Sequence, residues 1–228
     1  MNRRLLIGAV LTVMFVFALS ELVLPYVVAK RIETGLAKAY GTNDIHVTVK
    51  AWPALMMLGG SFSTITIDGH NIRTDKLTIS EFSTVFKDTN IDLRRLISER
   101  IVVFQQVGSF DGAIVLQEQE ITQFVSQAIK GFKNVHVTLL PEKMKVSGEW
   151  AIGPASVSLV MDGKLRGDNT QLKFAADQVF LNNSVVVGNF RGSTMTEFML
   201  FDTKKLPVAA TIRDVLMEEG RVVIRIVK

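Results

Sequence analysis

The chain contains no cysteine among its 228 residues. Disulfide frameworks, thiolate nucleophiles and cysteine-based metal sites are therefore excluded, and outside the cytoplasm the fold would be held together by its core alone. Histidine is nearly as scarce, and His46, His70 and His136 are scattered singly along the chain. His46 and His136 fall on the outward phase of expected strands, which favours solvated surface over a metal-binding or general-base role.

Catalytic signatures are also missing. The sequence has no H-E-x-x-H, G-x-S-x-G, S-x-x-K, Walker-type or G-x-G-x-x-G pattern. Its two acidic pairs, Glu118 with Glu120 and Glu218 with Glu219, border expected regular elements, where a helix start and a hairpin turn account for them. We therefore predict that the protein is not an enzyme and uses neither a cofactor nor a metal.

The net charge is small. The formal charge is +4, and the body that remains after residues 1–29 carries 24 basic and 21 acidic side chains. So mild an excess predicts no nucleic-acid partner. It suits a weak preference for anionic lipid surfaces, where each well-placed Lys or Arg contributes about 1 kcal/mol.

The N-terminus carries a long apolar run. Arg3-Arg4 precede an uncharged stretch from Leu5 to Leu19, which is the arrangement of a signal-type segment. A helix of that length reaches about 22 Å, short of the roughly 30 Å hydrocarbon core, whereas one that continues to Ala29 reaches about 37 Å and spans it. Two outcomes stay open: residues 1–29 remain as a membrane anchor, or a peptidase cleaves near Ala18-Leu19-Ser20. Either outcome puts the body outside the cytoplasm, as a single-pass protein of the cytoplasmic membrane facing the periplasm or cell surface, or as a secreted protein.

Residues 30–228 are predicted to form one extracytoplasmic domain rich in antiparallel strands. Alternating apolar and polar residues mark short strands at 47–49, 64–67, 77–79, 101–107, 113–116, 135–139, 144–146, 157–161, 172–176, 185–190, 208–212 and 222–227. Turns are expected at Asp68-Gly69, Asp111-Gly112, Asp162-Gly163, Gly167-Asp168-Asn169 and Glu219-Gly220. This spacing favours an antiparallel meander over βαβ units.

Helical periodicity appears in two places. Ile32, Leu36 and Tyr40 recur every four residues before Gly41, so the N-terminal helix continues as an amphipathic one whose stripe faces the core or an acyl chain. A second helix is marked by Ile121, Phe124, Val125, Ala128, Ile129 and Phe132, and a weaker pattern lies near 194–201. We predict an α+β fold, with a curved antiparallel β-sheet wrapped around one or two amphipathic helices and preceded by an N-terminal transmembrane or signal helix.

An uncharged loop follows the first strand. Residues 51–62 read AWPALMMLGGSF, an apolar stretch that is interrupted by Pro53 and by Gly59-Gly60. It is too short to span a membrane. Three interpretations are open: the loop packs against the core, lines the mouth of an apolar cavity, or dips into lipid. Methionine-rich surfaces suit irregular apolar partners such as acyl chains.

Several of these features recur together in one known family. A basic amphipathic helix begins at Lys30-Arg31-Ile32-Glu33, the loop joins Trp52-Pro53-Ala54-Leu55 to Leu58-Gly59-Gly60-Ser61-Phe62, and Leu206-Pro207-Val208 precedes Gly220-Arg221-Val222. This layout resembles the LmeA-like phospholipid-binding family of bacterial envelope proteins over nearly the whole chain. Trp52 departs from the plainer aromatic or glycine that often begins the motif, and residues 75–100 are not distinctive. The resemblance implies phospholipid binding by a curved sheet around a helix, similar to tubular lipid-binding proteins.

We therefore expect a non-enzymatic protein that holds or transfers phospholipid in an apolar groove for envelope maintenance, with phospholipid and the cytoplasmic membrane as partners. The expected lipid-binding side chains are Trp52, Leu55, Leu58 and Phe62 in the loop, and Ile121, Phe124, Val125 and Ile129 on the second helix. One alternative is a structural or interaction protein of the envelope that binds another protein and no lipid. A third class, an envelope hydrolase, would need His70 or His136 to meet a carboxylate and a serine.

Overall fold

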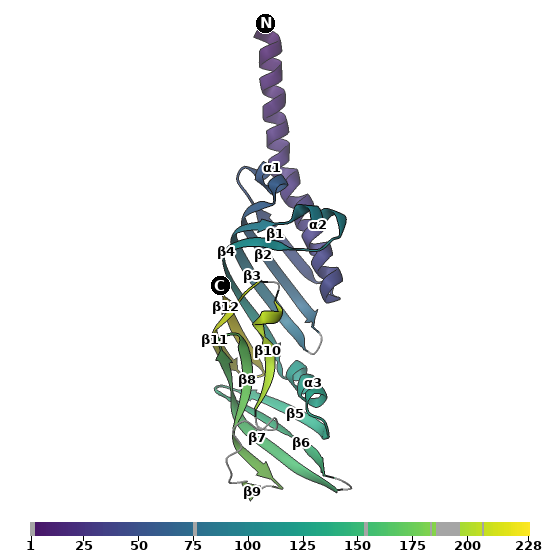
Figure 1. Cartoon of the computed structure of the whole chain (residues 1–228), viewed down its shortest axis with the longest axis vertical. Coiled ribbons are helices and arrows are strands. Elements are labelled where there is room, and N and C mark those ends of the chain that lie inside the picture. Colours follow the sequence, from purple (N-terminus) through teal and green to yellow (C-terminus); the bar gives the residue numbers. More distant parts are fainter. Residues whose placement is uncertain (1–2, 75–76, 153–154, 183, 186–196, 207) are drawn as a thin grey trace. The chain divides into compact units, whose positions relative to one another are not determined.

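The structure is a computed structural model, and it describes residues 3–74, 77–152, 155–182, 184–185, 197–206 and 208–228 (Figure 1). Its elements are α1 (Arg3–Tyr40), β1 (Ile45–Lys50), η1 (Ala54–Gly59), β2 (Ser61–Arg73), β3 (Thr78–Ile91), α2 (Leu93–Ser98), β4 (Phe104–Gln117), α3 (Glu118–Ala128), β5 (Phe132–Leu140), β6 (Lys143–Ile152), β7 (Ala155–Asp168), β8 (Gln171–Leu181), β9 (Ser184–Val185), β10 (Glu197–Asp202), η2 (Thr203–Lys205), β11 (Thr211–Glu218) and β12 (Arg221–Val227). Strand accounts for 55% of the residues and helix for 29%, which confirms the predicted α+β class.

The strands form two antiparallel sheets within the described residues, where the prediction named one. The first sheet has the order β1-β2-β3-β4-β12-β11, and the second has the order β10-β8-β7-β6-β5 with β9 beside β8. Neither sheet closes on itself. Most strands pair with their neighbours in sequence, which confirms the predicted meander.

The chain divides into two compact units. The first unit comprises residues 1–68 and 84–110 and contains α1, β1, η1 and α2. The second comprises residues 69–83 and 111–228 and contains α3 and the second sheet. Strands β2, β3 and β4 contribute residues to both units. The domain boundary expected after residue 29 stays a prediction, and α1 runs across it as a continuous helix.

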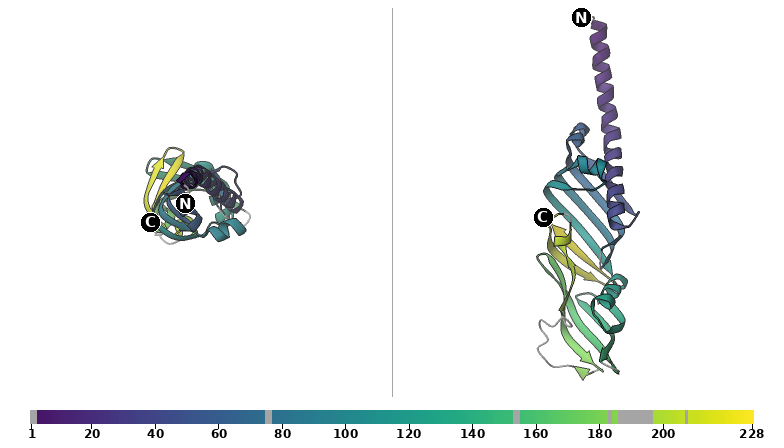
Figure 2. Two further views of the ribbon diagram at one scale, coloured as in Figure 1. Left: turned by 90° about the horizontal axis from the view of Figure 1, so that it is seen from above. Right: turned by 45° about the vertical axis from the view of Figure 1, so that its right-hand side comes forward.

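Helix α1 combines the apolar N-terminal segment and the amphipathic helix in one element, with Pro25 inside it. Ile32 and Leu36 of the predicted stripe are buried, and the C-terminal part of the helix lies along the strands of the first unit, in contact with β1 (Figure 2). Gly41 ends the helix with φ 63, a left-handed conformation that glycine adopts without a Cβ penalty. The predicted glycine stop is confirmed.

Two of the five predicted turns connect strands. Gly220 (φ 78) lies between β11 and β12, and Asn169 (φ 45) lies between β7 and β8. The three Asp-Gly pairs predicted as turns are wrong, because they lie inside β2, β4 and β7. At Gly163 the reason is a bulge: the β7–β8 register shifts there, and a Cβ would collide with the Ala175 backbone.

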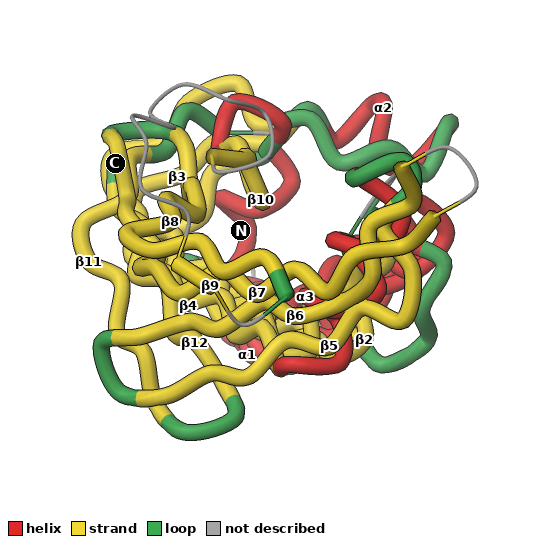
Figure 3. The backbone as a smooth tube through the Cα atoms, turned by 90° about the horizontal axis from the view of Figure 1, so that it is seen from below, coloured by secondary structure: helices red, strands yellow, loops and turns green. Residues whose placement is uncertain are grey.

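Helix α3 lies alongside β5 in the second unit (Figure 3). It is shorter than predicted, because Gly131 (φ 81) redirects the chain and Phe132 already belongs to β5. A capping box between Gln117 and Glu120 starts the helix. The weak helix near 194–201 is wrong where the structure describes it, since β10 begins at Glu197. Residues 194–196, and 186–190 of the expected strand 185–190, lie outside the described residues.

Candidate functional site

The N-terminal half of α1 exposes apolar side chains on all sides. Val13, Met14 and Phe15 each expose more than 60% of their surface, at 68%, 64% and 65%. Figure 1 shows this part of the helix extending past β1 and β2. By length and composition alone it is able to cross a membrane, and none of its most apolar stretch is buried, although a signal sequence would fit the same description.

The apolar loop after β1 folds as the 3₁₀ helix η1, which sorts its side chains into two sets. A 3₁₀ helix has three residues per turn, so Ala54, Met57 and Gly60 share one side, and all three are buried. Leu55 and Leu58 share the next side and expose 44% and 62% of their surface. The loop therefore packs against the core through one face and presents leucine on another.

Trp52 and Met56 extend the exposed face. Trp52 exposes 79% of its surface and Met56 51%, whereas Phe62, which the sequence placed in the same set, is buried at 3%. We name the four exposed residues Trp52, Leu55, Met56 and Leu58 the loop platform. Its backbone is held at Gly60, which ends η1 at φ 79 and accepts a hydrogen bond from the Ile91 N–H at 2.8 Å. Met56 was missed as a site residue, although it stands in the same apolar run.

The loop platform is attached to the apolar helix. The Trp52 ring meets the Phe17 ring edge-on, with 6.4 Å between centroids, and the Glu21 Oε1 accepts a hydrogen bond from the Ala54 N–H at 2.8 Å. The second bond satisfies a donor in the first turn of η1, where no residue within the short helix can. Two segments more than thirty residues apart in sequence therefore form one apolar surface.

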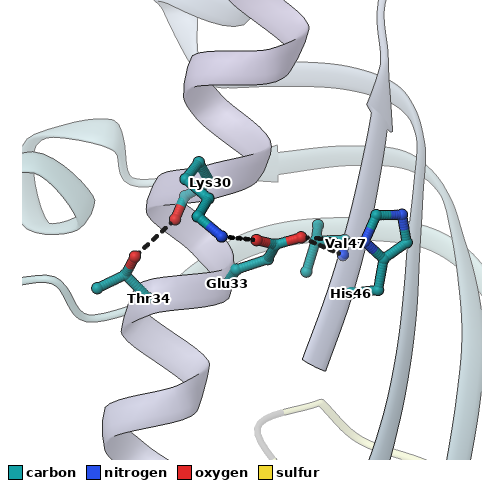
Figure 4. Close-up of polar contacts among 5 residues, drawn as sticks. All are labelled: Lys30, Glu33, Thr34, His46 and Val47. Atoms are coloured by element: carbon teal, nitrogen blue, oxygen red, sulfur yellow. Dashed lines mark hydrogen bonds and ion pairs between the residues drawn. The ribbon is translucent and has the colours of Figure 1, made fainter. Parts of the chain in front are cut away.

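Further along α1, Glu33 ties the helix to β1 (Figure 4). Its Oε1 accepts the Val47 N–H at 3.0 Å and lies 3.2 Å from His46 Nδ1, and its Oε2 lies 3.0 Å from Lys30 Nζ. Glu33 lies beyond the apolar N-terminal part of α1, in the part of the helix that packs on β1. Burial raises the pKa of this carboxyl, but the hydrogen bond from Val47, with Lys30 and His46, outweighs it, so the net pKa lies below its ordinary value.

The four predicted site residues around α3 belong to the second unit. Ile121 and Val125 expose none of their surface and Phe124 exposes 5%, so these three fill the core between α3 and the sheet. Ile129 caps the helix and is half-buried. The eight predicted residues therefore fall into two sets, four in the first unit with the loop and four in the second with α3.

The remaining polar candidates have structural partners. Glu118 Oε1 accepts the Leu139 N–H at 2.6 Å, and Glu120 Oε2 accepts the Gln117 N–H at 3.0 Å, so the first acidic pair starts α3 as predicted. Glu218 pairs with Arg221 across the β11–β12 turn at 2.6 Å. Among the residues that the structure describes, no three His, Asp or Glu side chains are grouped to hold a metal ion.

Comparison with known proteins gives one result. A family model described as LmeA-like phospholipid-binding matches residues 19–226 of the chain. Searches among curated proteins and among solved structures give no significant match. The matched range includes the loop platform, α3 and every strand except the last residue of β12, so the resemblance noted in the sequence motifs extends over both compact units. The chain belongs to the LmeA-like phospholipid-binding family.

Proposed function

We propose that this protein is a membrane-tethered, non-enzymatic phospholipid-binding protein of the bacterial envelope, which holds or passes on phospholipid for envelope maintenance. The observation that carries the proposal is the family match over residues 19–226. The exposed apolar half of α1 and the adjoining loop platform support it, because both offer surface that an acyl chain can cover. Such a function needs no catalytic residue.

The proposed lipid contacts are the predicted residues. Trp52, Leu55 and Leu58 are exposed and would meet lipid first, whereas Phe62, Ile121, Phe124 and Val125 are buried and would meet an acyl chain only after the interior opens. Ile129, half-buried at the end of α3, is the accessible member of its set. Each methylene removed from water contributes about 0.8 kcal/mol, so several methylenes offset a local opening of a few kcal/mol.

The proposed topology has α1 crossing the cytoplasmic membrane and the two units on its outer side. Arg3-Arg4 before the apolar run favour a cytoplasmic N-terminus. Intact-mass measurement of the protein from the membrane and soluble fractions tests this arrangement: the full mass in the membrane fraction means an anchor, and a soluble protein shortened near Ser20 means a secreted protein. Protease added outside spheroplasts should digest the body and leave the N-terminus protected.

Native mass spectrometry of the full chain, released from detergent, tests the binding function. We expect phospholipid to stay bound in addition to any molecules that remain around the apolar helix α1. We expect Leu58→Asp and Ile129→Asp to reduce this additional bound phospholipid while the protein stays folded. Leu216→Asp, at an exposed position on β11 (47%), is the matched control and should retain the lipid. Equal lipid retention in all variants, with no exchange of added phospholipid, would reject the function and favour an envelope protein that binds another protein.

A further inference from the structure

We infer that the loop platform is embedded in the outer leaflet of the same bilayer that α1 crosses, as a second membrane contact. The inference rests on the proposed membrane span of α1. It does not depend on whether the two units hold a lipid. The occupant is the hydrocarbon and glycerol region of the leaflet.

The depth follows from helix geometry. A hydrocarbon core of roughly 30 Å needs about 20 helical residues, so a span that starts at Leu5, after the arginine pair, ends near Leu24. Phe17 and Glu21, the two residues that hold the loop, come before that end, by about 10 Å and about 5 Å for an upright helix. Trp52 and Ala54, which contact these two residues, therefore lie inside the outer end of the span.

The chemistry of the loop suits that depth. Between Lys50 and Asp68 the sequence carries no charged residue, and the four platform residues point apolar surface outward. Tryptophan is enriched at the boundary between headgroups and acyl chains, because its ring is apolar and its N–H is polar. Lys50, exposed at the end of β1, directly precedes the loop, where a lipid phosphate would find a cation.

The loop is also built to keep this position. Ala54 and Met57 are fully buried. The Gly60 carbonyl accepts a hydrogen bond from the Ile91 N–H, and the Glu21 carboxylate accepts one from the Ala54 N–H. The platform is thus fixed to β3 at Gly60 and to α1 at Ala54. Two contacts with one leaflet, a helix and a rigid loop, would restrict how the first unit tilts on the membrane.

Fluorescence quenching of the full chain in vesicles tests the inference. The chain has two tryptophans, so Trp150→Phe leaves Trp52 as the reporter and Trp52→Phe leaves Trp150 as its matched control. Phosphatidylcholine and phosphatidylglycerol brominated in the upper acyl chain should remove most of the Trp52 emission and little of the Trp150 emission. Trp52 that is untouched by bromolipid and strongly quenched by aqueous acrylamide would overturn the inference.

A second probe covers the case in which a tryptophan variant fails to fold. Because the chain has no cysteine, Leu58→Cys and Leu216→Cys each provide a single spin-label site. The spin label at Leu58 should collide often with oxygen, which dissolves in lipid, and rarely with a water-soluble nickel complex. The label at Leu216 should collide more with the nickel complex than with oxygen. Water-like accessibility at Leu58 would contradict the inference, whereas the proposed phospholipid binding is tested separately by the native mass spectrometry described above.

Discussion

Glu21 of α1 accepts a hydrogen bond from the backbone N–H of Ala54 at 2.8 Å. An acidic residue in an apolar helix is costly to place in a membrane, yet here its carboxyl group caps the loop that carries Trp52, Leu55, Met56 and Leu58. The single charged side chain between Ser20 and Lys30 is therefore the one that joins the helix to the loop platform.

Replacing Glu21 should weaken the attachment of the loop platform to α1. Glu21→Ala leaves the Ala54 N–H without its partner, at a cost of about 1–3 kcal/mol for a group shielded from water. We expect faster hydrogen exchange at the Ala54 amide. Glu21→Gln keeps a side-chain oxygen acceptor and should restore most of the protection, and equal exchange rates in Glu21→Ala and the wild type would show that the bond does not hold the loop.

The two adjacent glycines of the loop should respond differently to alanine. Gly60 has φ 79, and a Cβ there would collide with the Ile91 carbonyl, whereas a Cβ on Gly59 meets no atom within 4 Å. Gly60→Ala should lower the free energy of unfolding by more than about 1 kcal/mol, and Gly59→Ala should leave it nearly unchanged. Denaturant unfolding in detergent measures both, and similar values for the two variants would contradict the structure.

The neighbouring methionines offer a second matched pair. Met57 is fully buried and Met56 exposes 51% of its surface. Truncation to alanine at Met57 should cost about 2–5 kcal/mol through lost packing, while Met56→Ala should change stability by less than about 0.5 kcal/mol and weaken only contact with lipid. Thermal unfolding and vesicle quenching of Trp52 separate the two effects. The reverse assignment would mean that η1 is rotated.

Acid should weaken the attachment of α1 to β1. The folded-state pKa of Glu33 is lowered, so its charged form stabilises the fold above the unfolded pKa, near the ordinary value of about 4.3. That contribution is lost as the pH falls through the folded pKa. The stability gap between wild type and Glu33→Gln should therefore be full at pH 7 and shrink below about pH 4. Glu149→Gln, at an exposed position on β6, is the control and should show no such gap.

The elements with a regular apolar pattern or a clear turn residue could be predicted from sequence. Helix α1, the core of α3 and the hairpin at Gly220 all follow from apolar periodicity or a single turn residue. Strand β3 was hidden beyond its first residues because its buried face carries Ser80, Thr84 and Thr89, which break the apolar pattern. Helix α2 is only six residues long, and its Asp92 cap alone is too weak a pattern to predict it from one sequence.

The candidate site was predictable in composition and not in geometry. The uncharged run after β1 identified Trp52, Leu55 and Leu58, but the separation of buried Met57 from exposed Met56 depends on η1 being a 3₁₀ helix. The partnership of Phe17 and Glu21 with the loop is a contact across distant sequence, which no local periodicity encodes. Glu21 appeared in the sequence only as a lone charge near the end of an apolar segment.

The most direct test of phospholipid binding is cross-linking of the full chain in vesicles that contain a phospholipid with a photoreactive group in its acyl chain. Residue-level mass spectrometry should find lipid attached to α1 and the loop platform, and also within α3, close to Phe124 and Ile129. Label on α3 that disappears when excess unlabelled phospholipid is added is the result we predict. Label confined to α1 and the loop platform, with none on α3, would contradict the proposal that the protein takes phospholipid into its body.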